Sequence, residues 1–180
     1  MATAHRIQIH LSDISQLFNS MDPSPFTEKD LDSDAEEFIV SWAQEYPHDE
    51  PLSLAIHLKN FPSGENPRPT IEEAVHNYFS YRTKMTQLEF SRLMKQGRTS
   101  LIIGLFFLAG CLAASESLPA RVPGTPATLL NFVREGLSIA GWVAMWRPME
   151  IYLYDWWPLR RRARIFQKLS RIPVEVHRKE

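Results

Sequence analysis

The sequence has little cysteine and lacks the short motifs that mark common catalytic sites. A single cysteine, Cys111, excludes an internal disulfide framework and a four-cysteine zinc site. The patterns G-x-S-x-G, G-x-x-x-x-G-K-S/T, G-x-G-x-x-G, H-E-x-x-H and C-x-x-C are absent. Cys111 falls inside an apolar run, where a thiol behaves as a small hydrophobic group. We therefore expect no enzymatic activity and no bound cofactor or metal.

The chain also lacks an overall excess of charge, with 20 basic and 21 acidic residues. The charges are unevenly distributed, because residues 1–98 contain 9 basic and 15 acidic side chains whereas residues 99–180 contain 11 and 6. No long apolar stretch follows Met1, so we expect no secretory signal peptide. The acidic first half argues against nucleic acid as a partner.

The longest uncharged apolar run is LIIGLFFLAGCLAA, from Leu101 to Ala114. A membrane-spanning helix needs about 20 apolar residues, and about 17 are tolerated. Extension of the run through its flanking residues gives a first transmembrane helix over residues 99–118. Inside a soluble core, this run would need apolar partners on every side, which a chain of 180 residues would struggle to supply.

A second apolar region, residues 129–159, is too long to cross a bilayer as one straight helix. In the favoured register, residues 129–147 form the second transmembrane helix, Pro148 ends the regular helix, and the remainder lies along the membrane interface. In the other register, residues 136–159 cross the bilayer and place Arg147 near its centre, at a cost of at least about 2.5 kcal/mol. The favoured register makes residues 119–128 a short external loop.

Basic residues flank both predicted spans on the same side, which predicts that both termini are cytoplasmic. Arg92, Lys95 and Arg98 precede the first span. The second span is followed by aromatic residues that suit a membrane interface, Tyr152, Tyr154, Trp156 and Trp157, and then by a basic group, Arg160, Arg161, Arg162 and Arg164. Each basic residue near an anionic membrane surface contributes about 1 kcal/mol of attraction. We therefore expect anionic lipid headgroups to bind the basic group.

Ionisable residues within or beside the second span are costly and often functional; they are Arg134, Glu135, Arg147, Glu150 and Asp155. Arg147 and Glu150 are three residues apart and can pair on one helix face. In one interpretation, Arg134 extends to the outer headgroups and Arg147, Glu150 and Asp155 form the polar face of an interfacial helix. In the other, these last three residues line a polar path through an oligomer of hairpins.

The first half of the chain predicts a small α+β domain of strand-helix-strand-helix order. Alternating apolar residues indicate strands over residues 6–11 and 52–58, and an apolar stripe with helical spacing indicates a helix over residues 31–46. These elements form a cytoplasmic domain over residues 1–69. A two-stranded sheet is marginal alone, so homodimerisation that completes a four-stranded sheet is a further hypothesis.

The predicted domain connects to the membrane through a long helix over residues 70–98. Thr70 and Glu73 form a capping-box pattern at its start. Beyond the hairpin, residues 148–180 are predicted to form an interfacial aromatic segment followed by a basic cytoplasmic tail.

Acidic residues cluster around the start of the first predicted helix: Asp30, Asp32, Asp34, Glu36 and Glu37. The D-x-D-x-D spacing is that of a calcium loop, but Ala35 replaces the required glycine and Ser41 replaces the bidentate glutamate. Negative charge is favourable in the first turn of a helix, so these residues need no metal. We interpret them as an acidic docking face for a basic protein partner.

Histidine is the other metal-ligating residue type in this half. His10 and His57 fall on the outer faces of the two predicted strands, with His5 or His48 as a conceivable third ligand. No fixed spacing supports a site, and catalytic zinc usually takes three protein ligands. We expect no metal at these histidines.

Two segments resemble a family of uncharacterised bacterial membrane proteins: RIQIHLSDISQLFNSMDPSPFTEKDLD and REGLSIAGWVAMWRPMEIYLYDWWPLRRRARIF. The resemblance covers most of the chain and implies a small cytoplasmic domain, a two-helix anchor and residence in the bacterial inner membrane. It implies no catalytic residue. We expect an anchored interaction or complex-assembly module that binds a protein partner or a second copy of itself. An oligomeric ion or solute transport element is the alternative.

Overall fold

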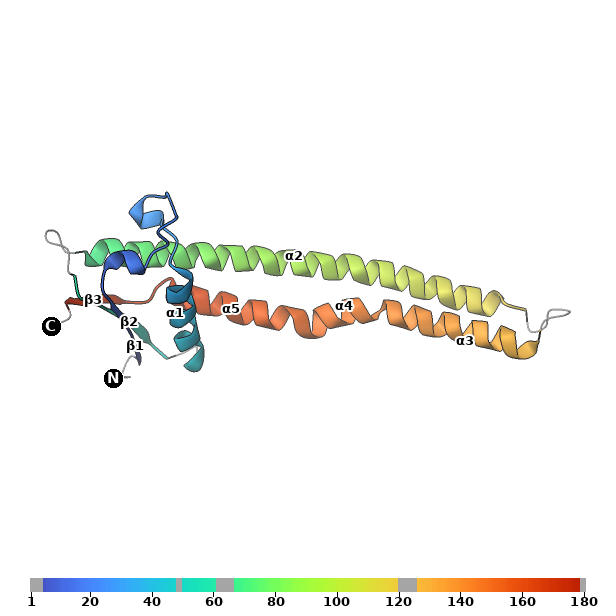
Figure 1. Cartoon of the computed structure of the whole chain (residues 1–180). Coiled ribbons are helices and arrows are strands. Elements are labelled where there is room, and N and C mark those ends of the chain that lie inside the picture. Colours follow the sequence, from blue (N-terminus) through green and yellow to red (C-terminus); the bar gives the residue numbers. More distant parts are fainter. Residues whose placement is uncertain (1–4, 48–49, 61–66, 120–125, 179–180) are drawn as a thin grey trace. The chain divides into compact units, whose positions relative to one another are not determined.

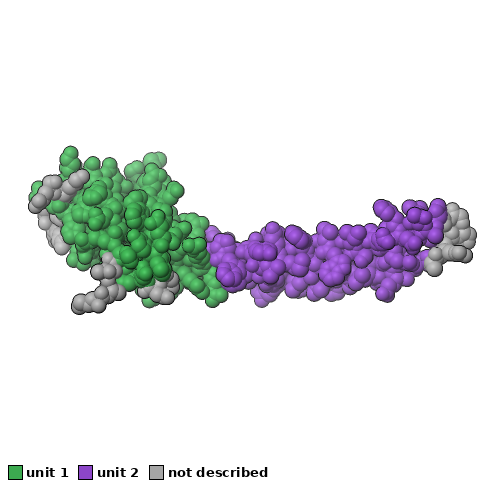
Figure 2. Space-filling view, turned by 90° about the horizontal axis from the view of Figure 1, so that it is seen from below, with its two compact units in different colours: residues 1–87, 160–180 green, residues 88–159 purple. Residues whose placement is uncertain are grey.

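The computed structural model describes residues 5–47, 50–60, 67–119 and 126–178. The chain divides into two compact units, which Figure 2 distinguishes by colour. Unit 1 contains residues 1–87 and 160–180, and unit 2 contains residues 88–159. The fold class is α+β, as predicted, and Figure 1 shows the order of the elements along the chain.

Unit 1 is built on a three-stranded parallel sheet with the strand order β1-β2-β3. β1 (His5–Leu11) and β2 (Leu52–Leu58) lie where strands were predicted. β3 (Val174–Arg178) pairs with the other edge of β2, with Val174 opposite Leu54. The prediction of a basic tail at the C-terminus was therefore wrong, because this segment supplies the third strand. The dimer hypothesis loses its basis, since it assumed a sheet of only two strands.

One face of the sheet holds the hydrophobic core of unit 1. It packs against α1 (Ser33–Glu45), the first turns of α2 (Arg68–Ser117) and the end of α5 (Trp156–Leu169). The ring centroids of Phe79 and Phe166 lie 6.1 Å apart, so these two side chains form a contact between α2 and α5. The other large and fully buried side chains of this core include Ile7, Leu17, Ile39, Leu54, Ile56, Leu58, Ile71, Val75 and Leu169. The core therefore contains residues from both ends of the chain.

Local sequence explains where the helices begin. Asp32 caps α1, because its side chain accepts a hydrogen bond from the Asp34 N–H at 3.0 Å. α2 begins at Arg68, so the predicted capping residue Thr70 lies inside the helix and the capping-box prediction was wrong. Pro69 is tolerated in this first turn because its missing N–H would have no helical partner there. The predicted helix and the first predicted span form one continuous helix.

Unit 2 contains the second half of α2, which packs against α3 (Ala127–Ala144). The two helices approach closely at Gly141, where a Cβ atom would lie 2.8 Å from Leu108 Cδ1 and 3.2 Å from Cys111 Cβ. A side chain at this position would therefore hold the two helices apart. The buried thiol of Cys111 fills space in this contact, in agreement with its expected role as a small hydrophobic group.

After α3 the chain continues through α4 (Trp146–Glu150), a π-helical turn η3 (Ile151–Asp155) and α5. α3 ends at Ala144, whose carbonyl would accept a hydrogen bond from residue 148 in a continuing helix. Residue 148 is proline and has no N–H to donate. The break therefore lies four residues before Pro148, whereas the sequence predicted an end at the proline itself.

Among the described residues, one helix is long and apolar enough to cross a membrane, and it is α2. Only 17% of its most apolar stretch is buried. α3 does not meet the same standard, and it carries Arg134 and Glu135 within its length. Length and composition therefore support one helix of the predicted hairpin and leave the second as a proposal.

Candidate functional site

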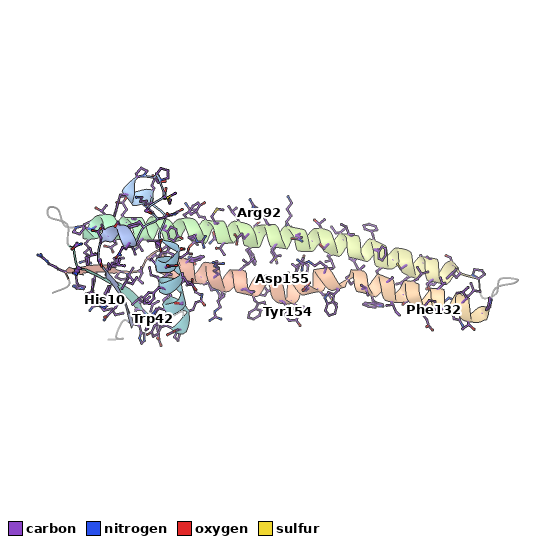
Figure 3. The ribbon with its side chains drawn as sticks, viewed as in Figure 1. His10, Trp42, Arg92, Phe132, Tyr154 and Asp155 are labelled. Carbon is purple, nitrogen blue, oxygen red and sulfur yellow. The ribbon has the colours of Figure 1, made fainter. Side chains whose placement is uncertain are left out.

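Three of the predicted charged residues of unit 2 meet around the π-helical turn, and we call them the ionic cluster: Arg147, Glu150 and Asp155. Arg147 Nη1 donates to Glu150 Oε2 at 2.9 Å and lies 3.2 Å from Asp155 Oδ2. Figure 3 labels Asp155, the last residue of η3. The sequence predicted the pairing of Arg147 with Glu150. It did not predict that Asp155 would be a second partner of the same guanidinium.

A close contact with α2 accompanies the π-helical turn. A Cβ atom at Gly97 would lie 2.9 Å from Ile151 Cγ2, and Ile151 is fully buried. Turns of this kind are rare and frequently occur at functional sites. The contact places the π-helical turn beside Gly97 of α2. Gly97 is adjacent to Arg98 and precedes the apolar run, so the turn lies beside the part of α2 just before that run.

The predicted interface aromatics lie on and immediately after η3. Tyr154, labelled in Figure 3, exposes 70% of its surface, and Trp157 exposes 64%. The indole N–H of Trp156 donates to the Tyr152 carbonyl at 2.8 Å, and its ring lies 5.1 Å from that of Trp157. These rings combine an apolar body with a polar edge, which is the property that suits a membrane interface.

Arg134 has a role that sequence reasoning missed. Its Nε donates to the Ser115 carbonyl at 3.2 Å, and its Nη2 donates to the Leu118 carbonyl at 2.9 Å. These carbonyls lie at the end of α2, where the helix offers no N–H partners and its dipole attracts a cation. Arg134 thus caps α2, whereas the sequence suggested that it extends to lipid headgroups. The neighbouring Glu135 is exposed.

The five residues of the predicted acidic docking face have different roles. Asp32 caps α1, and Glu36 is bonded to α2: its carboxylate accepts a hydrogen bond from the Tyr78 hydroxyl at 2.6 Å and pairs with Arg82 at 2.8 Å. Burial, reinforced by the bond to Glu36, raises the pKa of Tyr78 well above its ordinary value. The three exposed members, which we call the acidic face, are Asp30, Asp34 and Glu37.

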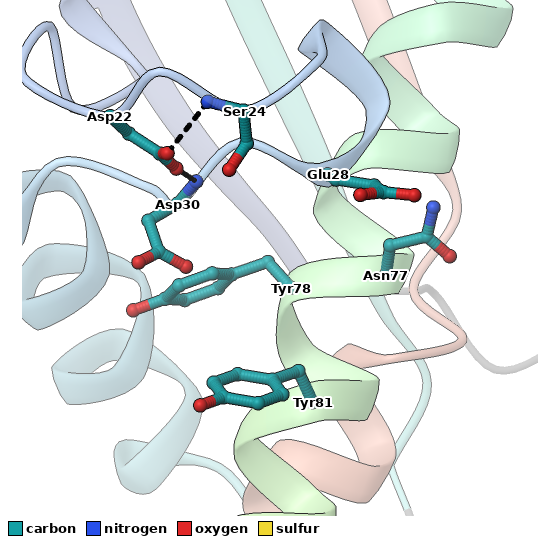
Figure 4. Close-up of a pocket in the computed structure, with 7 residues that line it drawn as sticks. All are labelled: Asp22, Ser24, Glu28, Asp30, Asn77, Tyr78 and Tyr81. Carbon is teal, nitrogen blue, oxygen red and sulfur yellow. Dashed lines mark hydrogen bonds between the residues drawn. The ribbon is translucent and has the colours of Figure 1, made fainter.

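Asp30 also borders a hollow of about 350 Å³ in unit 1, shown in Figure 4. The residues that line it are Asp22, Ser24, Glu28, Asp30, Asn77, Tyr78 and Tyr81. The Asp22 carboxylate accepts backbone N–H bonds from Ser24 at 2.9 Å and from Asp30 at 2.7 Å. These bonds stabilise the charged form and lower the pKa of Asp22. Asp22 therefore joins the two ends of the loop over residues 22–30, which lies beside α2.

Three histidines lie in one row across the sheet. His10, His57 and His177 occupy matching positions of the three strands, and their ring centroids are 4.7 Å and 5.2 Å apart. Sequence reasoning placed His10 beside His57, but it named His5 or His48 as a third member instead of His177. His48 lies outside the described residues. The rings are stacked, and the described part of the chain contains no group of three side chains that could hold a metal.

The predicted basic group lies on α5. Arg160, Arg161 and Arg164 are exposed. Arg162 is exposed as well, but its guanidinium also lies over the ring of Phe166, 5.5 Å from the ring centroid. The four arginines are therefore not equivalent, although the sequence grouped them together.

Comparison of the chain with known proteins identified no relative. No protein-family model, no curated protein and no solved structure matches it. The resemblance to bacterial two-helix membrane proteins therefore stays a prediction.

Proposed function

We propose that the chain is a two-pass integral protein of the bacterial inner membrane, whose helical hairpin anchors unit 1 at the cytoplasmic face. The order of the two units along the chain carries this proposal. Residues 1–87 and 160–180 share one core, while the intervening residues 88–159 expose many large apolar side chains. Because both ends of unit 2 lead into the same folded core, any crossing of the bilayer must occur an even number of times.

The surface of unit 2 supports its burial in lipid. Phe106 on α2 exposes 77% of its surface, and Phe132 and Trp142 on α3 expose 72% and 63%. Soluble monomers rarely expose contiguous apolar patches larger than a few hundred Å². Helices satisfy their own backbone hydrogen bonds, which is what the hydrocarbon interior of a bilayer requires. A lipid environment therefore accounts for side chains that would be unfavourable in water.

The packing between the helices favours one of the two membrane registers. Ile151 lies against Gly97, which is adjacent to Arg98. A span over residues 136–159 would draw this part of α2 toward the bilayer centre, where a single charge costs about 2.5–3.5 kcal/mol. A span over residues 129–147 avoids that cost and leaves the ionic cluster at the inner interface.

The charges of unit 1 support an interaction or complex-assembly role. The acidic face and the hollow beside it offer a basic protein partner several carboxylates on one small domain. The transport alternative has less support, because Arg147 pairs with two carboxylates of its own chain. These pairs satisfy the charges locally without a path through an oligomer.

Labelling of engineered cysteines tests the topology. In a Cys111→Ser background, single cysteines replace Ser117 at the end of α2 or Ser33 at the start of α1. We expect a membrane-impermeant maleimide to label Ser117→Cys in intact spheroplasts, to label Ser33→Cys only after lysis, and the protein to remain in the membrane after alkaline washing. Release by alkali, or labelling of Ser33→Cys before lysis, would contradict the proposal.

Charge reversal tests the interaction role. We expect Asp34→Lys combined with Glu37→Lys to abolish recovery of a partner chain when the protein is purified gently from its membrane and examined by native mass spectrometry. The matched control reverses the same number of charges elsewhere on unit 1, at the exposed Glu45 and Glu73. Equal partner recovery from the two double variants would rule out the acidic face as the docking surface.

A further inference from the structure

The two faces of α5 are chemically distinct. Ile165, Phe166 and Leu169 are buried in the core of unit 1, with exposed fractions of 8%, 1% and 0%. The helix contains no acidic residue. The charges on its exposed side are therefore all positive, and the core holds this helix in a fixed rotation about its own axis.

Arg161 and Arg164 share the exposed side. Residues three apart lie on the same face of a helix, separated by about 4.5 Å along its axis. Arg162 is exposed as well, but its guanidinium is engaged, because it lies over the ring of Phe166. Lys168 is also engaged, since its Nζ donates to the Pro47 carbonyl at 2.9 Å. Arg161 and Arg164 are thus neighbouring exposed arginines on one face of the helix.

The direction of the helix brings this pair toward the membrane. Side chains on an α-helix lean toward its N-terminus, and the N-terminus of α5 follows directly on the predicted membrane segment. Arg161 is about 6 Å along the helix beyond Trp157, and Arg164 is about 10 Å beyond it. The surface potential of an anionic membrane falls off within a Debye length of about 8–10 Å. In the proposed orientation, in which Trp157 lies at the membrane surface, both arginines fall within this range.

We infer that Arg161 and Arg164 form a binding site for the phosphate of an anionic phospholipid at the inner leaflet. A guanidinium presents two parallel N–H donors that match two phosphate oxygens, and it is more easily desolvated than an ammonium group. The inference rests on the proposed function, because the site requires that α5 begins at the membrane surface. It deepens that proposal, since a bound lipid would hold α5, and through it the core of unit 1, against the leaflet.

Lipid binding to the full-length protein tests the inference. The protein, purified in detergent, is titrated with phosphatidylglycerol or with phosphatidylcholine of the same acyl chains, and native mass spectrometry counts the bound lipids. We expect the wild type to retain phosphatidylglycerol preferentially. Each Arg→Gln change should weaken this preference by up to about fivefold, the equivalent of about 1 kcal/mol per basic residue, with Arg161→Gln having the larger effect because it is nearer the membrane.

The double variant Arg161→Gln/Arg164→Gln should lose the preference for phosphatidylglycerol. A second double variant with the same loss of charge provides the control. Arg162→Gln combined with Arg171→Gln removes two positive charges from the same region but leaves Arg161 and Arg164 in place. We expect this variant to keep the preference of the wild type. An equal loss in both double variants would overturn the site, because it would reduce the effect to net charge. Retention of the preference by Arg161→Gln/Arg164→Gln would overturn the site as well. A parallel titration with a DNA duplex tests nucleic acid as the ligand, and tighter binding of the duplex than of the lipid would also overturn the site.

The alkaline wash described above separates this inference from the proposed function. Protein that stays in the membrane but shows no preference for phosphatidylglycerol would refute the lipid site alone. Protein that is released by the wash would refute the anchor on which the site depends.

Discussion

At the scale of single residues, Glu36 illustrates how tertiary contacts change the role of a charge. The sequence places it among acidic residues that suit a surface, yet its carboxylate bonds to Tyr78 and Arg82 on α2 and is only 18% exposed. A half-buried carboxylate with two partners fixes the distance between two helices. Glu36 therefore has a structural role, and only the exposed residues of the acidic face are available to bind a partner.

We expect Glu36→Gln to destabilise unit 1 by about 1–3 kcal/mol, because the Arg82 guanidinium would lose the charge that it pairs with. Chemical denaturation of the full chain in detergent, followed by circular dichroism, measures the loss. Glu37→Gln is the control, because Glu37 is exposed and its replacement should change stability by less than about 0.5 kcal/mol. Equal stability of the two variants would show that the bonds of Glu36 contribute nothing.

The raised pKa of Tyr78 gives unit 1 an alkaline limit. The folded state favours the neutral phenol, so its contribution is fully present below the ordinary tyrosine pKa of about 10 and is lost as the pH rises above it. Tyr78→Phe should remove this dependence, because phenylalanine does not titrate. Unfolding curves at increasing alkaline pH provide the measurement. An unchanged alkaline slope in Tyr78→Phe would assign the loss to other groups.

The lowered pKa of Asp22 predicts the opposite dependence for the loop that it closes. Its charged form accepts two backbone N–H bonds, so the stabilisation is present above the ordinary aspartate pKa of about 3.9 and is lost as the pH falls through the lower folded value. We expect Asp22→Asn to accelerate hydrogen exchange of the Asp30 amide at neutral pH. Asp34→Asn is the control, and equal exchange in both variants would mean that Asp22 does not protect that amide.

At the scale of elements, local patterns predicted what local forces determine. The alternation of β1 and β2 and the stripe of α1 each require only a periodic sequence in contact with a core. β3 escaped prediction because it has five residues and gains its stability from β2, more than a hundred residues earlier. Arg134 was misinterpreted for the same reason, since its acceptors lie on another helix. The ionic cluster was half predicted, because Glu150 follows the three-residue rule and Asp155 lies eight residues away.

The contact between α2 and α3 depends on the absence of a side chain at Gly141. We expect Gly141→Val to destabilise the helix pair by about 1–3 kcal/mol, because the new atoms would overlap Leu108 and Cys111. Gly136→Val is the matched control on the same helix, since no atom lies within 4 Å of a Cβ atom at that position. Thermal unfolding in detergent compares the two. Similar midpoints would indicate that α2 and α3 do not pack through Gly141.

At the scale of the whole molecule, the main consequence of the fold is that unit 1 is assembled from the two ends of the chain. Every residue of its core cluster lies in residues 1–87 or 160–180. Hydrogen bonds reinforce the joint, because Arg68 Nε donates to the Val174 carbonyl at 3.0 Å and a ring nitrogen of His76 lies 2.7 Å from the Ile172 carbonyl. The domain therefore cannot be complete until the chain has passed through the hairpin and returned.

This arrangement predicts that the hairpin can be removed without loss of the domain. Residues 1–87 joined to residues 160–180 through about ten Gly and Ser residues should fold and remain soluble without detergent, because such a linker spans about 16–19 Å and α2 lies beside α5. Residues 1–87 alone should not fold, since they lack Phe166 and β3, and a two-stranded sheet is marginal. Size-exclusion chromatography and the dispersion of amide NMR signals distinguish the outcomes. Folding of residues 1–87 alone would show that the C-terminal segment is an accessory, and aggregation of the linked variant would show that unit 1 depends on unit 2.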